Sequence, residues 1–161
     1  MIFNNLLVQI LTLIAAIIAS CIVSKLAEEE LLQYTPLLKK TVKVMFVLTL
    51  ISPVLFVEKI LTIVFVALSY GVISFPQKNE IQTFYFLSPL TLFLATQNTN
   101  AFIITLSMFF IVTLLTTTLL LTKFVKKRII WKKELFYSIA RRYYTFVLIS
   151  VLLYCITYFL S

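Results

Sequence analysis

The chain contains no histidine, no aspartate and a single glycine, Gly71, among its 161 residues. Without histidine, the zinc sites and catalytic triads that need an imidazole cannot form within one chain. One glycine is too few for the glycine-rich loops that hold phosphates or dinucleotides. The two cysteines, Cys21 and Cys155, are too far apart in the sequence to match a metal-ligand spacing. We therefore expect no metal centre, no cofactor and no catalytic residue of these types.

Charged residues are also scarce. They make up 12% of the chain, whereas hydrophobic residues make up 61%. An ordinary soluble domain has about 25% charged and about 45 to 50% apolar residues, and a chain of this length forms one domain. The sequence therefore predicts an all-α, polytopic transmembrane bundle, with residues 1–161 as a single integral membrane domain.

Uncharged runs long enough to cross the membrane locate the predicted spans, since the hydrocarbon core of about 30 Å needs about 20 helical residues. We expect about six spans, at 2–24, 42–57, 60–75, 81–96, 101–122 and 143–160. The polar break Gln97-Asn98-Thr99-Asn100 separates the fourth from the fifth. The second and third are short and are separated only by Glu58 and Lys59. A re-entrant hairpin over 42–75 is the alternative to two full spans.

Basic residues predict the orientation, because Lys and Arg are retained on the cytoplasmic side of a membrane. With six spans, the first, third and fifth connections share one side. All basic residues except Lys59 then fall on that side, thirteen of the fourteen in the chain. We therefore predict a multi-pass protein of the cell membrane, with both termini outside and the basic connections in the cytoplasm.

The first of these connections carries three consecutive acidic residues, Glu28, Glu29 and Glu30. They begin a short predicted helix that Pro36 ends, because a proline disfavours helical backbone at the residue before it. Acidic residues at a helix start are stabilised by the helix dipole, so a solvated helix start is the plain interpretation. The alternative is that the glutamates bind a partner or pair with the basic fifth connection.

That fifth connection, residues 123–142, predicts an amphipathic helix lying on the cytoplasmic face. Its basic side chains would bind anionic lipid headgroups, and Trp131 suits the interface between lipid and water. A docking surface for another molecule is the alternative. The net charge of +8 does not by itself indicate nucleic acid, because insertion explains where the positive charges lie. The candidate interaction residues here are Lys126, Lys127, Arg128, Trp131, Lys132, Lys133, Arg141 and Arg142.

The segment Glu28 to Lys40, EEELLQYTPLLKK, follows the first predicted span. It resembles a juxtamembrane pattern in small multi-spanning archaeal membrane proteins, in which Glu-Glu-Leu is followed by Gly and Lys-Tyr. Here the Gly is absent and Tyr34 precedes the lysines. The resemblance implies a membrane location and a six-span arrangement, and it implies no activity.

Three classes of function agree with these patterns. The first is a non-catalytic scaffold or small subunit that assembles with a membrane-protein partner or with its own copies. The second is a small oligomeric transporter, channel or lipid-moving protein. The third is a membrane enzyme on a lipid-linked substrate that uses Glu28 to Glu30 with Arg141 and Arg142. The scarcity of charge inside the predicted spans favours the first.

Overall fold

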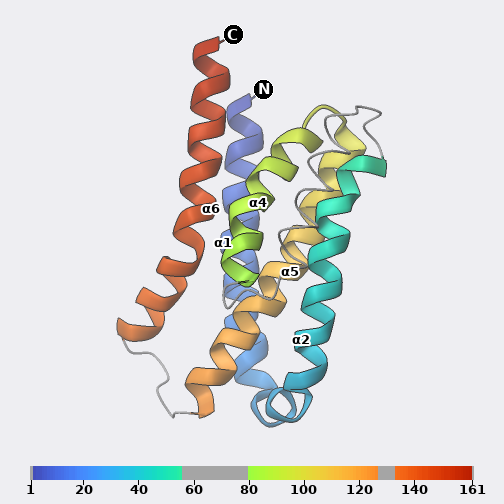
Figure 1. Cartoon of the computed structure of the whole chain (residues 1–161). Helices are drawn as coiled ribbons and strands as arrows, with labels where there is room; N and C mark the ends of the chain where they lie inside the picture. Colours follow the sequence, from blue (N-terminus) through green and yellow to red (C-terminus); the bar gives the residue numbers. More distant parts are fainter. Residues whose placement is uncertain (1, 56–79, 127–132, 161) are drawn as a thin grey trace.

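The computed structural model describes residues 2–55, 80–126 and 133–160 (Figure 1). Within these ranges the chain is helical and has no strand, which confirms the predicted all-α fold. The predicted span 60–75 and the pair Glu58 and Lys59 lie outside the described residues. The helices are α1 (Ile2–Leu26), α2 (Glu28–Ile51), the 3-10 helix η1 (Ser52–Leu55), α4 (Glu80–Ala95), α5 (Thr99–Lys126) and α6 (Lys133–Leu160).

Three of these helices are long and apolar enough to cross a membrane. The segments with this length and apolar character are Asn4–Leu26, Thr99–Thr122 and Tyr137–Ile156, and they lie close to three of the predicted spans. Helix α4 covers the predicted span 81–96, but its 16 residues reach only about 24 Å at 1.5 Å per residue. Its length is therefore short of the hydrocarbon thickness of about 30 Å.

The turn between α4 and α5 lies at the predicted polar break. The side-chain oxygen of Asn98 accepts hydrogen bonds from the backbone N–H groups of Asn100, at 2.9 Å, and Ala101, at 3.2 Å. Asparagine is among the best residues for this capping role, because it satisfies N–H groups that have no partner within the helix. Asn98 is thus the last residue of a three-residue turn, 96–98, and caps the start of α5 at Thr99.

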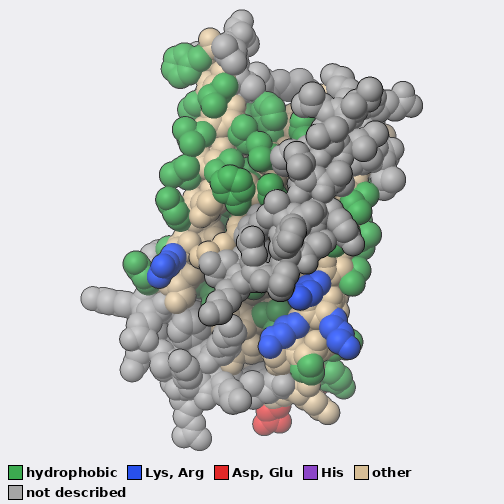
Figure 2. Space-filling view, in the orientation of Figure 1, with side chains coloured by type: hydrophobic (Ala, Val, Ile, Leu, Met, Phe, Trp, Pro, Cys, Tyr) green, Lys and Arg blue, Asp and Glu red, His purple; other side chains and the backbone are tan. Residues whose placement is uncertain are grey.

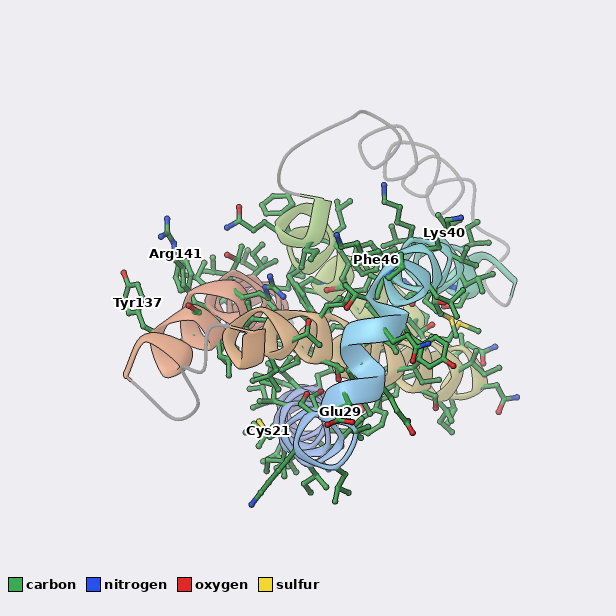
Figure 3. All side chains as sticks on the ribbon, turned by 90° about the horizontal axis from the view of Figure 1, so that it is seen from below. Cys21, Glu29, Lys40, Phe46, Tyr137 and Arg141 are labelled. Atoms are coloured by element: carbon green, nitrogen blue, oxygen red, sulfur yellow. The ribbon has the colours of Figure 1, made fainter. Side chains whose placement is uncertain are left out.

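Helix α2 differs from the prediction at its first proline. The sequence predicts that Pro36 ends a short helix, and this is wrong, because α2 continues through Pro36 as far as Ile51. The helix changes direction instead, so that its first turns run across the lower end of the bundle (Figures 1 and 3). Pro36 has no N–H to donate to the Leu32 carbonyl oxygen, and a helix bends where a proline interrupts its hydrogen bonds. The adjacent Thr35 hydroxyl donates to the Leu31 carbonyl oxygen at 2.8 Å, a type of bond that also bends helices.

A second proline, Pro53, lies just past the end of α2. Helix α2 ends at Ile51, just before Ser52 and Pro53. The chain continues as η1, and the Ser52 hydroxyl donates to the carbonyl oxygen of Thr49 at 2.8 Å. The interruption that Pro53 predicts is therefore present in the structure.

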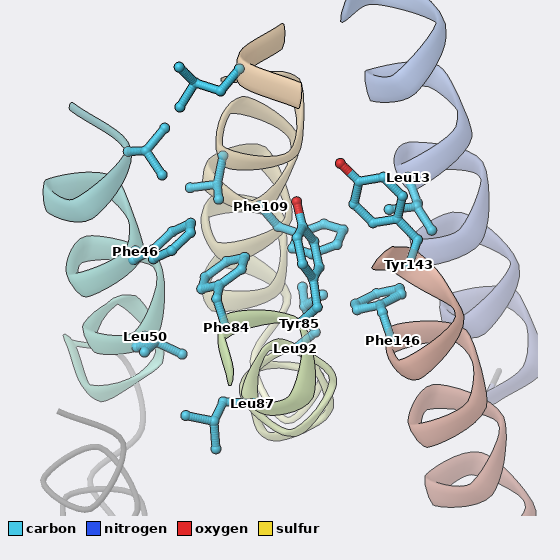
Figure 4. Packing of buried hydrophobic residues seen from close by; sticks show 13 residues of the cluster. Leu13, Phe46, Leu50, Phe84, Tyr85, Leu87, Leu92, Phe109, Tyr143 and Phe146 are labelled. Carbon is cyan, nitrogen blue, oxygen red and sulfur yellow. The ribbon is translucent and has the colours of Figure 1, made fainter. Parts of the chain in front are cut away.

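Helix α5 is the central helix of the bundle. Half of its membrane-length segment (50%) is buried, compared with 22% for α1 and for α6. Stacked phenylalanines cross the core, with ring centroids 4.2 Å apart for Phe46 and Phe84 and 4.6 Å apart for Phe109 and Phe146 (Figure 4). Because these rings come from α2, α4, α5 and α6, aromatic packing joins four helices.

The predicted basic helix over 123–142 is not a separate element. Residues 123–126 are the last turn of α5, and residues 133–142 are the first turns of α6. Residues 127–132, which include Lys127, Arg128, Trp131 and Lys132, lie outside the described residues. The described ends of the predicted helix therefore continue α5 and α6.

Candidate functional site

Buried polar side chains run through the interior of the bundle. The buried members are uncharged hydroxyls and one amide: Gln9, Ser20, Ser24, Thr49, Ser52, Ser88, Thr91, Thr105, Thr113, Thr116, Thr117, Thr118, Thr122 and Ser150. Several α5 threonines among them bond backbone carbonyls and neighbouring helices. Thr117 donates to the Thr113 carbonyl oxygen at 2.7 Å and also bonds the Tyr143 hydroxyl of α6.

Hydrogen bonds join several of these polar side chains across neighbouring helices. The Tyr85 hydroxyl of α4 lies 2.6 Å from Thr116 Oγ1 of α5, and the Ser52 hydroxyl lies 2.9 Å from Thr105 Oγ1. The Gln9 side chain of α1 donates to the Tyr154 hydroxyl of α6 at 2.8 Å. Such bonds between membrane helices are worth about 0.6 kcal/mol on average. Together they hold the helices in register without any buried charge among the described residues.

Small residues bring α1 against α5. Ala16 and Ser20 lie four residues apart on α1, and both are fully buried. The Ser20 Oγ lies 2.6 Å from the Ala16 carbonyl oxygen and 2.9 Å from the Leu114 carbonyl oxygen of α5. A larger side chain at either position would separate the two backbones.

A cavity of about 320 Å³ opens between α2, α4, α5 and α6, and we call it the basic pocket. Its volume falls within the range of small-molecule sites, about 300 to 1,000 Å³. Among the described residues that line it, three are cationic, Lys39, Lys43 and Arg142, and none is acidic. The other lining residues are Thr35, Val42, Phe46, Ile81, Leu119 and Leu120. The pocket therefore combines positive charge with apolar walls.

Helix α2 supplies one wall of the basic pocket as a single stripe. Thr35, Lys39 and Lys43 recur every four residues, and Val42 and Phe46 follow the same face. Sequence reasoning used these lysines only for orientation and did not recognise them as part of a site. The four-residue spacing was the available signal, but it could not reveal that α6 brings Arg142 to the same cavity.

Arg142 is the most constrained cation of the pocket. It is half-buried, and its Nη1 donates to the Thr116 carbonyl oxygen of α5 at 3.0 Å. Thr116 stands six residues before the end of the apolar segment Thr99–Thr122, which corresponds to about 9 Å along the helix. The guanidinium is therefore drawn toward the level of the apolar part of the bundle. Sequence reasoning placed Arg142 just outside the last span.

The structure does not bring the described glutamates to the described arginines. Glu29, Glu30 and Arg141 are exposed, and Glu29 and Arg141 lie on separate sides of the lower end of the bundle (Figure 3). Arg142 bonds a backbone carbonyl, and no ion pair joins it to Glu29 or Glu30. The predicted pairing is wrong for these residues, because the first turns of α2 stay beside the end of α1 while Arg142 lies higher, against α5.

Other predicted site residues are placed only by their backbone. Glu28 begins α2, Lys126 ends α5 and Lys133 begins α6. The remaining candidates, Lys127, Arg128, Trp131 and Lys132, belong to 127–132 and lie outside the described residues. The two cysteines are free thiols, with Cys155 exposed on α6.

An open apolar groove runs between α1 and α6, with a volume of about 580 Å³. None of its described lining residues is charged. It is lined by Ile17, Ile139, Ala140, Tyr143, Tyr144, Val147, Leu148, Val151 and Leu152. A groove of this composition suits an acyl chain or another apolar helix.

In comparisons with known proteins, no protein family, no curated protein and no solved structure matches the chain. What the chain does is therefore argued from its own residues.

Proposed function

We propose that this chain is a non-catalytic integral membrane protein, a scaffold or small subunit of a membrane complex. One observation carries the proposal. The polar side chains that link the helices bond one another or the backbone, with Tyr85 on Thr116 and Gln9 on Tyr154 as examples. Polar groups that bond between helices in this way serve packing, and no charged side chain is buried among the described residues, which favours a structural role over chemistry inside the membrane.

The outward faces of α1 and α6 support assembly with a partner. Both helices present large apolar side chains to the outside, such as Leu11 and Ile18 on α1 and Leu152 on α6. Lipid covers such faces in an isolated bundle, and another membrane helix covers them in a complex. We propose a membrane-protein partner or a second copy of the chain as the occupant of the groove between these helices.

The proposed setting is the cell membrane, crossed about six times, with both termini outside. The chain termini lie at the same end of the bundle (Figure 1), as an even number of crossings requires. The basic side chains of α2 lie toward the other end, where an anionic cytoplasmic leaflet would attract them (Figure 2). No nucleic-acid role is proposed.

A lipid-moving or transport function is the second candidate, and the basic pocket is the observation that favours it. A pocket with cationic and apolar walls can accept an amphipathic anion. Movement of that ligand would need a second arrangement of the helices around the pocket.

The mass of the particle in mild detergent distinguishes the two candidates. Light scattering, corrected for bound detergent, gives the protein mass of the particle. We expect a complex of fixed stoichiometry, either of several copies of the chain or of the chain with one membrane-protein partner. Replacing Leu148 by Trp in the groove should reduce that complex to single chains. A single-chain particle that moves labelled lipid between the leaflets of proteoliposomes would contradict the scaffold proposal and support the second candidate.

A further inference from the structure

We infer that the basic pocket is a binding site for one phosphate-bearing anionic lipid, held by its headgroup. This inference rests on the proposed membrane location. It goes beyond a general attraction between basic residues and the membrane, because it assigns one lipid to one cavity and names the side chains that hold it. The residues concerned are Lys39, Lys43 and Arg142.

Charge is the first argument. Three cationic side chains from two helices line one cavity, and no acidic residue stands among its described lining residues. Cations gathered in this way attract an anion, and basic pockets between membrane helices bind lipid headgroups. The basic side chains over α2 are seen together in Figure 2, away from the acidic side chains at the lower end.

The position of Arg142 is the second argument. Arg142 is half-buried, and its guanidinium bonds the Thr116 carbonyl oxygen, which fixes its depth in the bundle. A carbonyl oxygen satisfies one N–H group but supplies no negative charge. A cation held near the apolar level of a membrane needs a counter-ion, and no described carboxylate pairs with it. A lipid phosphate reaches this depth from the leaflet, and guanidinium matches phosphate geometry.

The apolar walls identify the ligand as a lipid instead of a soluble anion. Val42, Phe46 and Leu120 line the same cavity as the cations. A free phosphate would leave these side chains facing water, whereas the glycerol and upper acyl carbons of a lipid would cover them. The combination therefore suits a molecule that is anionic at one end and apolar at the other.

Two pairs of neighbouring residues provide matched controls. Arg142 lines the pocket, and the adjacent Arg141 is exposed outside it. Lys39 lines the pocket, and the adjacent exposed Lys40 does not. Substitution by Gln removes one positive charge from the chain at either member of a pair. A difference in lipid affinity between the two variants of a pair therefore reports contact with the pocket and not the loss of net charge.

The experiment titrates the full chain, purified in mild detergent, with dioleoyl phosphatidic acid and counts bound lipids by native mass spectrometry. We expect one tightly bound lipid per chain and weaker binding of dioleoyl phosphatidylcholine. Arg142→Gln and Lys39→Gln should each lower the affinity for phosphatidic acid about tenfold, which is the usual effect of losing one charge-assisted hydrogen bond. Arg141→Gln and Lys40→Gln should leave the affinity unchanged.

Three results would overturn the site. Equal weakening by all four substitutions would show attraction by surface charge alone. If millimolar inorganic phosphate displaced the bound phosphatidic acid as effectively as added phosphatidic acid does, the pocket would be a site for a soluble anion. Equal affinity for phosphatidic acid and phosphatidylcholine would show that the cationic side chains do not select the headgroup. Lys39 is exposed, so its variant keeps the test valid if Arg142→Gln does not fold. Lipid titration in detergent is independent of orientation and of partner binding, so its failure would leave the scaffold proposal standing.

Discussion

Arg142 Nη1 donates to the carbonyl oxygen of Thr116 at 3.0 Å, which ties the first turns of α6 to the middle of α5. The same segment of α5 bonds Tyr85 of α4 through Thr116 and Tyr143 of α6 through Thr117. Three helices therefore meet at one turn of α5. The basic pocket lies beside this junction, and the bond to Thr116 fixes the position of Arg142 in the pocket wall.

The hydroxyl of Tyr85 should contribute measurably to the stability of this junction. Tyr85 is fully buried, and its hydroxyl lies 2.6 Å from Thr116 Oγ1. Tyr85→Phe should lower the free energy of unfolding by about 0.6 to 1.7 kcal/mol, the range for hydrogen bonds between membrane helices. Thermal unfolding in detergent checks this, with the exposed Tyr144→Phe as the control. Equal melting temperatures of Tyr85→Phe and the unmodified protein would contradict the assigned bond.

The aromatic core predicts a much larger effect at Phe84. Its ring is fully buried and stacks on Phe46 at 4.2 Å, whereas Phe86 on the same helix is 53% exposed. Phe84→Ala should cost about 3 to 5 kcal/mol, because it removes the stacked ring and leaves a cavity. Phe86→Ala should cost much less. The two variants are compared by the fraction of folded protein after extraction and by melting temperature. A similar loss of stability in both variants would show that α4 is rotated about its axis from the orientation described.

The contact between α1 and α5 should be sensitive to side-chain volume at one alanine and not at its neighbour. Ala16 is fully buried, and the adjacent Ala15 is exposed. Ala16→Leu should destabilise the bundle by about 1 to 3 kcal/mol through overpacking. Ala15→Leu, which adds the same atoms on the outer face, serves as the control. Equal tolerance of both substitutions, read from the melting temperatures, would argue against close packing of these helices.

The orientation of the chain is tested by labelling single cysteines from outside the cell. Cys is introduced separately at Lys40, Gln97 and Lys127, in a background in which Cys21 and Cys155 are Ser. An impermeant maleimide should label position 97 in intact cells, whereas positions 40 and 127 should react only after permeabilisation, because basic connections stay in the cytoplasm. Labelling of position 127 in intact cells would reverse the proposed orientation.

The sequence by itself determined the helical class and the approximate ends of several helices. Scarce charge and long apolar runs leave the backbone no other way to satisfy its hydrogen bonds in lipid, so α1, α5 and α6 follow from composition. Local chemistry set the break at Asn98 and the end of α2 before Pro53, because capping and proline geometry depend on adjacent residues. These features need no distant contact.

Only the tertiary structure decided where the polar and basic side chains meet. Pro36 could end a helix or bend it, and the continuation of α2 depends on its surroundings, which the sequence does not reveal. Lys39 and Arg142 are more than a hundred residues apart, and nothing local shows that they line one cavity. The pairing of Glu29 with the arginines was predicted from their shared side of the membrane. It failed because sharing a side does not determine which helix faces which, and the packing of α6 on α5 turns Arg142 toward Thr116.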